Sequence, residues 1–130
     1  MRKTENALIW LKRAESNFAR AAIGKSDEKI LYEDLCFDCQ QTVEKSLKAL
    51  LVLYNQESII THSISLLLSN IQEYIPIVIP DFVNESVILT DYAVQTRYPG
   101  FYEAVIEDDY KIALHLAGQV LDWVKEEIEK

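Results

Sequence analysis

Five side chains in this sequence have the types that hold a phosphate group. Two lysines, a histidine, an arginine and a tyrosine make up the set: Lys45, Lys48, His62, Arg97 and Tyr98. Cationic groups stabilise phosphate charge, and an aromatic ring gives a nucleobase a surface on which to stack. If the five side chains converge on one cleft, we expect that cleft to bind a nucleotide or an RNA phosphate.

Each of these residues also has a structural interpretation, because most polar side chains are solvated or support the fold. Glu44 and Lys48 stand four residues apart, in the order that favours an ion pair on a helix surface. His62 follows Thr61, which can cap a helix, and it can form local hydrogen bonds there. Arg97 can hold its connector to carboxylates or to helix carbonyls. In this alternative, three neighbouring residues face solvent or another helix end: Gln40, Gln41 and Lys45.

The elements that must position these side chains are helices. Apolar residues recur at the i, i+3, i+4, i+7 spacing of a buried helical stripe. This spacing predicts helices over five ranges: 4–23, 32–54, 61–75, 81–96 and 108–129. Thr4 and Thr61 are the expected N-caps, and Gly24 is expected to end the first helix. We expect one domain over residues 1–130 with an all-α fold, an up-and-down antiparallel bundle of four to five helices.

Two apolar features are interpreted as packing. Pro76 and Pro80 bracket the β-branched run 77–79, and prolines at both ends favour a packed apolar loop over a strand. Cys36 and Cys39 lie three residues apart on the apolar face of the second helix, where buried cysteines behave as small hydrophobes. A zinc site would need further cysteines or histidines at ligand spacing, so we assign no metal and no cofactor.

The last helix has more apolar residues than one stripe requires. Ile112, Leu116 and Trp123 widen its apolar face. Burial in the core is the favoured explanation of this surplus, and a partner surface is the alternative.

The composition limits the possible partners. The 130 residues carry a net charge of −8, which leaves no excess of cations for coating nucleic acid, so DNA is not an expected partner. The start of the chain lacks the apolar region of a signal peptide, and no uncharged apolar stretch reaches the roughly 18 residues of a membrane span. We therefore expect a cytoplasmic protein that does not cross a membrane.

Three segments occur in the order found in a known family. They are QQTVEKSLK at residues 40–48, THSISLL at 61–67 and TRYP at 96–99. Together they resemble the HEPN domain family, named for higher eukaryotes, prokaryotes and nucleotide binding, and the resemblance covers nearly the whole chain. It implies a HEPN-like helical bundle in which four residues belong to the structural motif: Gln40, Gln41, Glu44 and Pro99. It also implies a homodimer that acts beside a small nucleotidyltransferase.

Many members of this family are metal-independent ribonucleases of toxin–antitoxin systems. Their motif is an arginine, about four to six other residues, and then a histidine that exchanges protons near neutral pH. Arg97 matches the arginine, but the three positions open to the histidine hold other residues: Tyr102, Glu103 and Ala104. Because an unperturbed tyrosine is a poor base at neutral pH, we expect no ribonuclease activity.

The sequence therefore favours a non-catalytic HEPN-type module. Such a module would homodimerise, pair with a small nucleotidyltransferase-like protein and bind a nucleotide or an RNA phosphate. Two alternatives stay open. The first is a ribonuclease toxin that uses Arg97 with a nonstandard acid–base residue, and the second is a ligand-free bundle that serves assembly alone.

Overall fold

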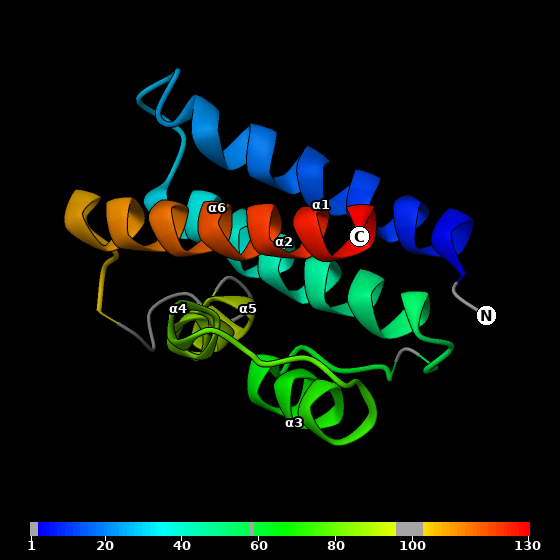
Figure 1. Cartoon of the computed structure of the whole chain (residues 1–130). Helices are drawn as coiled ribbons and strands as arrows, with labels where there is room; N and C mark the ends of the chain where they lie inside the picture. Colours follow the sequence, from blue (N-terminus) through cyan, green and yellow to red (C-terminus); the bar gives the residue numbers. More distant parts are fainter. Residues whose placement is uncertain (1–2, 58, 96–102) are drawn as a thin grey trace.

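The computed structural model describes residues 3–57, 59–95 and 103–130, and every regular element in these ranges is helical (Figure 1). The all-α prediction is therefore confirmed. Three long helices lie side by side, and shorter helices lie along one side of them. The elements are α1 (Thr4–Ile23), α2 (Tyr32–Leu53), α3 (Ile64–Tyr74), α4 (Asp81–Glu85), the 3-10 helix η1 (Ser86–Asp91), α5 (Tyr92–Gln95) and α6 (Glu107–Glu129).

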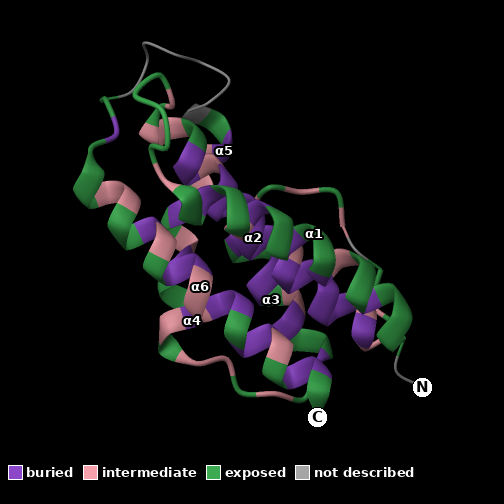
Figure 2. Cartoon of the chain, turned by 90° about the horizontal axis from the view of Figure 1, so that it is seen from above, coloured by how far each residue is buried: buried purple, intermediate pink, exposed green. Residues whose placement is uncertain are grey.

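The central element is α2, which contacts α1, α3, α5, η1 and α6. Most of its residues are buried, and Figure 2 shows the buried residues concentrated where the helices face one another. Its predicted apolar stripe is in the core, with Val43, Leu47 and Leu50 fully buried. The helix is buried on more than that stripe, so its polar residues must also find partners inside the protein.

The first two helices run antiparallel, as predicted. The backbone amide of Lys3 donates to the carbonyl of Leu53 at 3.0 Å, and at the other end of the pair Arg20 binds Asp38 at 2.7 Å. The last helix also packs closely on α1: a Cβ added at Gly118 would lie 3.2 Å from the ring of Phe18. A small residue at position 118 is what allows this approach.

The prediction that Cys36 and Cys39 are packed in the core is confirmed. Cys36 and Cys39 are free thiols with no exposed surface. Burial raises the pKa of the Cys36 thiol to about 12, and burial likewise raises the pKa of Cys39, so both remain protonated at neutral pH. The run between the prolines is a loop, as expected, with Ile77 and Ile79 packed on the core and Val78 exposed.

Helix boundaries differ from the prediction in two places. Lys3 precedes the first helix, so Thr4 already lies inside α1 and is not its N-cap. The third helix begins at Ile64 because the hydroxyl of Ser63, two residues beyond Thr61, accepts the amide of Leu66 at 3.2 Å. Gly24 does end α1, with a φ of 72° that a glycine adopts at little cost.

The predicted fourth helix over 81–96 is wrong as a single α-helix. It is divided into α4, η1 and α5. The buried hydroxyl of Ser86 donates to the carbonyl of Val83 at 2.6 Å, a side-chain bond that competes with the α-helical pattern. The β-branched pair Val87 and Ile88 follows, and such residues lower helix propensity. None of the described helices combines the length and apolar character of a membrane span.

Leu47 offers a test of the α2-centred core. Leu47→Ala should lower the free energy of unfolding by about 2–5 kcal/mol, because it leaves a cavity at a fully buried position. Leu8→Ala is the matched control, since Leu8 lies on α1 with 46% of its surface exposed, and its effect should stay within about 0.5 kcal/mol. Urea unfolding followed by circular dichroism measures both. Equal effects of the two substitutions would show that α2 is not the centre of the core.

Candidate functional site: a buried polar network on the central helix

Glu44 lies at the centre of a hydrogen-bond network on α2. Its side chain is only 4% exposed. One carboxylate oxygen, Oε2, accepts from the amine of Lys48 at 3.0 Å. The other, Oε1, accepts from the amides of Gln40 and Gln41 at 3.1 and 3.3 Å and is 2.8 Å from Nδ1 of His62. Both oxygens of this buried charge are therefore satisfied.

His62 connects this network to the segment that enters α3. A carboxylate only accepts hydrogen bonds, so the 2.8 Å contact places a proton on Nδ1 of His62. The backbone carbonyl of the same residue accepts from the amide of Gln40 at 3.0 Å. Glu44 and Gln40 of α2 thus hold His62 by its ring and by its backbone carbonyl. The His62 side chain nevertheless remains 48% exposed.

The environment of Glu44 favours its charged form. Burial by itself would raise the pKa of this carboxyl, but hydrogen bonds from His62, Lys48 and Gln40, together with the charge of Lys48, outweigh burial and lower the pKa below its usual value. The Lys48 amine also lies 5.5 Å from the centre of the Trp10 ring on α1. The network therefore spans three parts of the chain: α1, α2 and the approach to α3.

A second network joins α1 to α2. The amine of Lys45 donates to the side-chain oxygen of Asn17 at 2.8 Å, and the amide nitrogen of Asn17 donates to Asp38 at 2.9 Å. Arg20 contacts both oxygens of the same carboxylate, at 2.7 and 3.4 Å. Asn17 and Asp38 are buried and were not among the predicted site residues. Asn17 falls on the apolar stripe of α1 between Ala14 and Ala21, and this position indicates its burial.

The structure describes three of the five predicted phosphate ligands. Lys48 and His62 meet at Glu44, whereas Lys45 turns to Asn17 on α1. Arg97 and Tyr98 lie outside the described residues, as do Pro99 and Tyr102. Convergence of all five on one cleft stays a prediction.

Two structural interpretations need correction. The ion pair of Glu44 with Lys48 is not on a helix surface, because both side chains are more than nine-tenths buried. Gln40 and Gln41 do not face solvent, since Gln40 has no exposed surface and Gln41 donates to Gln40 at 2.7 Å. The reason is common to both: α2 is covered on several sides, so its polar insert is enclosed with the rest of the helix.

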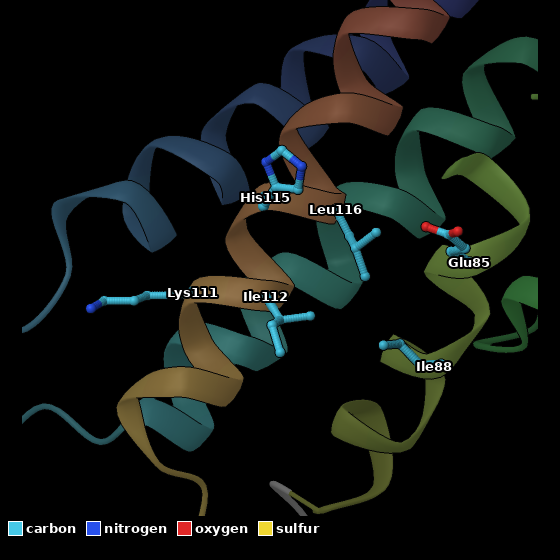
Figure 3. Close-up of a pocket in the computed structure, with 6 residues that line it drawn as sticks. All are labelled: Glu85, Ile88, Lys111, Ile112, His115 and Leu116. Atoms are coloured by element: carbon cyan, nitrogen blue, oxygen red, sulfur yellow. The ribbon is translucent and has the colours of Figure 1, made fainter. Parts of the chain in front are cut away.

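A separate apolar groove lies between α6 and the α4–η1 segment. It has a volume of about 600 Å³. Ile112 and Leu116 of α6 point across it toward Ile88 and Glu85 (Figure 3). Ile88 and Ile112 are 62% and 53% exposed, while Leu116 is buried. Six residues line the groove: Glu85, Ile88, Lys111, Ile112, His115 and Leu116.

The sequence and the fold are similar to those of known proteins. The HEPN domain family matches residues 7–128. The crystal structure of ST0689, described as an archaeal HEPN homologue, is 31% identical with a TM-score of 0.72, covering 98% of this chain and 99% of that chain. The crystal structure of TT1696 from Thermus thermophilus is 30% identical with a TM-score of 0.74, covering 97% and 98%. No curated protein sequence matches the chain. The helical bundle and the sequence match agree: the chain belongs to the HEPN domain family.

Removing the charge of Glu44 should destabilise the protein. Glu44→Gln leaves the Lys48 ammonium buried without its partner, and we expect a loss of about 3–5 kcal/mol in the free energy of unfolding. The double variant Glu44→Gln, Lys48→Met should be more stable than Glu44→Gln alone, because neither charge remains. Urea unfolding at neutral pH measures both. A Glu44→Gln protein as stable as the wild type would contradict a structural ion pair.

The pH dependence of stability gives a second test of Glu44. Its pKa in the folded protein lies below the ordinary value of 4.5, so its stabilisation is present above about pH 4.5 and is lost as the pH falls through the lower folded value. The free energy of unfolding of the wild type minus that of the double variant should therefore decrease below about pH 4.5. Urea unfolding at a series of acidic pH values measures this difference. If the wild type instead gains stability relative to the double variant in acid, the pKa of Glu44 is not lowered in the folded protein.

Proposed function

We propose that this HEPN protein is a non-catalytic cytoplasmic module that homodimerises, pairs with a small nucleotidyltransferase-like protein and binds a nucleotide or an RNA phosphate. The observation that carries the assembly part is the apolar groove beside α6. Two isoleucines, Ile88 and Ile112, are more than half exposed on its opposite walls. Apolar surface gathered in a groove is typical of a contact with another chain.

Charge supports a second copy of this chain as the occupant. Two copies with a net charge of −8 each repel one another over most of their surface. Glu85 is the one carboxylate among the residues that line the groove, and the Lys111 ammonium points away from it and pairs with Glu107 at 3.2 Å, so the groove itself carries little charge (Figure 3). A twofold arrangement that joins two grooves buries isoleucines and avoids bringing acidic surface against acidic surface.

The contacts of the polar residues support the non-catalytic part. Lys48 and His62 both contact Glu44, and Lys45 donates to Asn17. Two of the three described candidate ligands are thus bound to a carboxylate that they stabilise. We assign a catalytic role to none of them, and the ribonuclease alternative gains no support from these contacts.

The nucleotidyltransferase-like partner is proposed from family membership alone. A gene for such a protein beside this one, and a complex of the two proteins on size exclusion, would support the pairing. If the mixed proteins elute separately, this part of the proposal is wrong, while homodimerisation is tested independently by the groove variants.

Ile112→Glu should separate the proposed dimer into single chains. The substitution places a charge on the groove wall at a position that is 53% exposed in the single chain, so the fold itself should tolerate it. Light scattering coupled to size exclusion should give the mass of two chains for wild type and of one chain for the variant.

The matched control is Ile9→Glu on α1, where the isoleucine is 59% exposed and distant in sequence from the groove. This variant should remain dimeric. A wild-type protein with the mass of one chain, or a dimer that persists in Ile112→Glu, would overturn the groove as the dimer interface.

A further inference from the structure

Helix α1 packs along α2 (Figure 1), and charged residues of both helices lie at their contact. On α1, Arg13, Asn17 and Arg20 recur at the i, i+4, i+7 spacing of one helix face. Opposite them, Lys45 and Asp38 of α2 both bind Asn17, at 2.8 and 2.9 Å. Arg13 stands one turn before Asn17 and therefore lies along the same stretch as the Lys45 amine. We call this set of residues the polar seam, with Lys48 and Glu44 continuing it toward Trp10.

The charges of the polar seam do not balance. It holds four cations and two carboxylates, a net of +2 in a chain of net −8: Arg13, Arg20, Lys45 and Lys48 against Asp38 and Glu44. Both carboxylates are buried beneath the seam and are already bound by Arg20 and Lys48. Arg13 is exposed, and neither it nor Lys45 forms an ion pair with any other residue that the structure describes.

Lys45 lies close enough to Arg13 and Arg20 for their charges to act on its amine. Partial burial lowers the pKa of its amine most, and the charges of Arg13 and Arg20 lower it further. Glu44 and Asp38 act in the opposite direction, but the pKa remains below its usual value. An anion bound beside Arg13 and Lys45 would compensate this positive potential.

We propose that the open side of the polar seam binds a phosphate monoester, with Arg13 and Lys45 as its direct ligands. A monoester carries about −1.5 to −2 charges near neutral pH, which matches the net +2 of the seam better than the single charge of an internal phosphodiester. Arginine presents a planar fork of donors to phosphate, and lysine adds a compact charge.

An aromatic ring extends the site in one direction. Trp10 stands three residues before Arg13, so the two side chains share a face of α1. The ring is half-buried and holds Lys48 at 5.5 Å from its centre. A base attached to the bound phosphate can stack near Trp10, which makes a nucleoside monophosphate the preferred ligand. This inference deepens the nucleotide-binding part of the proposed function and rests on it, whereas the groove and its dimer are independent of it.

Calorimetric titration of the full chain with four probes tests the site. The probes are AMP, inorganic phosphate, adenosine and a short RNA without a terminal phosphate. We expect AMP to bind most tightly, phosphate more weakly and adenosine not to bind. AMP affinity should fall as salt is added, because the contacts are ionic. Adenosine binding as tightly as AMP would overturn the phosphate assignment, and an RNA without terminal phosphate that binds as tightly as AMP would overturn the preference for a monoester.

Variants locate the site. Arg13→Ala and Lys45→Met should each weaken AMP binding about tenfold or more, which is what loss of one charge-assisted hydrogen bond to phosphate predicts. Arg13→Ala removes no contact that holds the fold, so a loss of binding there cannot be attributed to unfolding. Lys12→Ala is the matched control, since Lys12 is exposed, adjacent in sequence and on a different face of α1.

Failure of the phosphate site and failure of the groove dimer give different results. AMP binding that is unchanged in Arg13→Ala and Lys45→Met, or weakened equally by Lys12→Ala, would show that the polar seam is not the site. A wild-type protein that forms the dimer but gives no heat with AMP or phosphate would overturn the site and leave the assembly function intact.

Discussion

A carboxylate buried inside a helical bundle must have its charge compensated and its oxygens hydrogen-bonded, and Glu44 sets this requirement in the middle of α2. Lys48 supplies the charge, and Gln40, Gln41 and His62 supply the remaining contacts. The contact between His62 and Glu44 fixes the segment that leads into α3, because His62 must lie against α2 to make it. It also brings Lys48 under the ring of Trp10 on α1. One buried charge thus links three parts of the chain that are distant in sequence.

The sequence predicts the long helices because their apolar spacing is regular. α1 and α6 agree with their predicted ranges to within a residue, and the stripe of α2 lies in the core. The segment 81–96 could not be predicted as well. Its apolar spacing resembles a helix, but the buried Ser86 hydroxyl bonds a neighbouring carbonyl, and only the folded environment determines whether such a hydroxyl turns inward.

The polar residues show where sequence reasoning is weaker. An i, i+4 pair such as Glu44 and Lys48 has the same spacing on an exposed helix and on a covered one, so its burial depends on the neighbouring helices. The family motif identifies Gln40 and Glu44 without giving their role, which becomes clear only from their contacts with His62. Asn17, missed entirely, joins Lys45 to α1. The phosphate site that we propose therefore lies on the face shared by α1 and α2, while convergence of the five predicted ligands stays a prediction.

We propose that this protein acts by assembly through the groove beside α6, while the buried polar network around Glu44 holds the fold. Cross-chain nuclear Overhauser effects test it most directly, in a sample that mixes isotope-labelled and unlabelled chains. We expect cross-chain contacts from the methyl groups of Ile88 and Ile112 and none from Ile9. Cross-chain contacts that arise from α1 instead, or no cross-chain contacts at all, would contradict it.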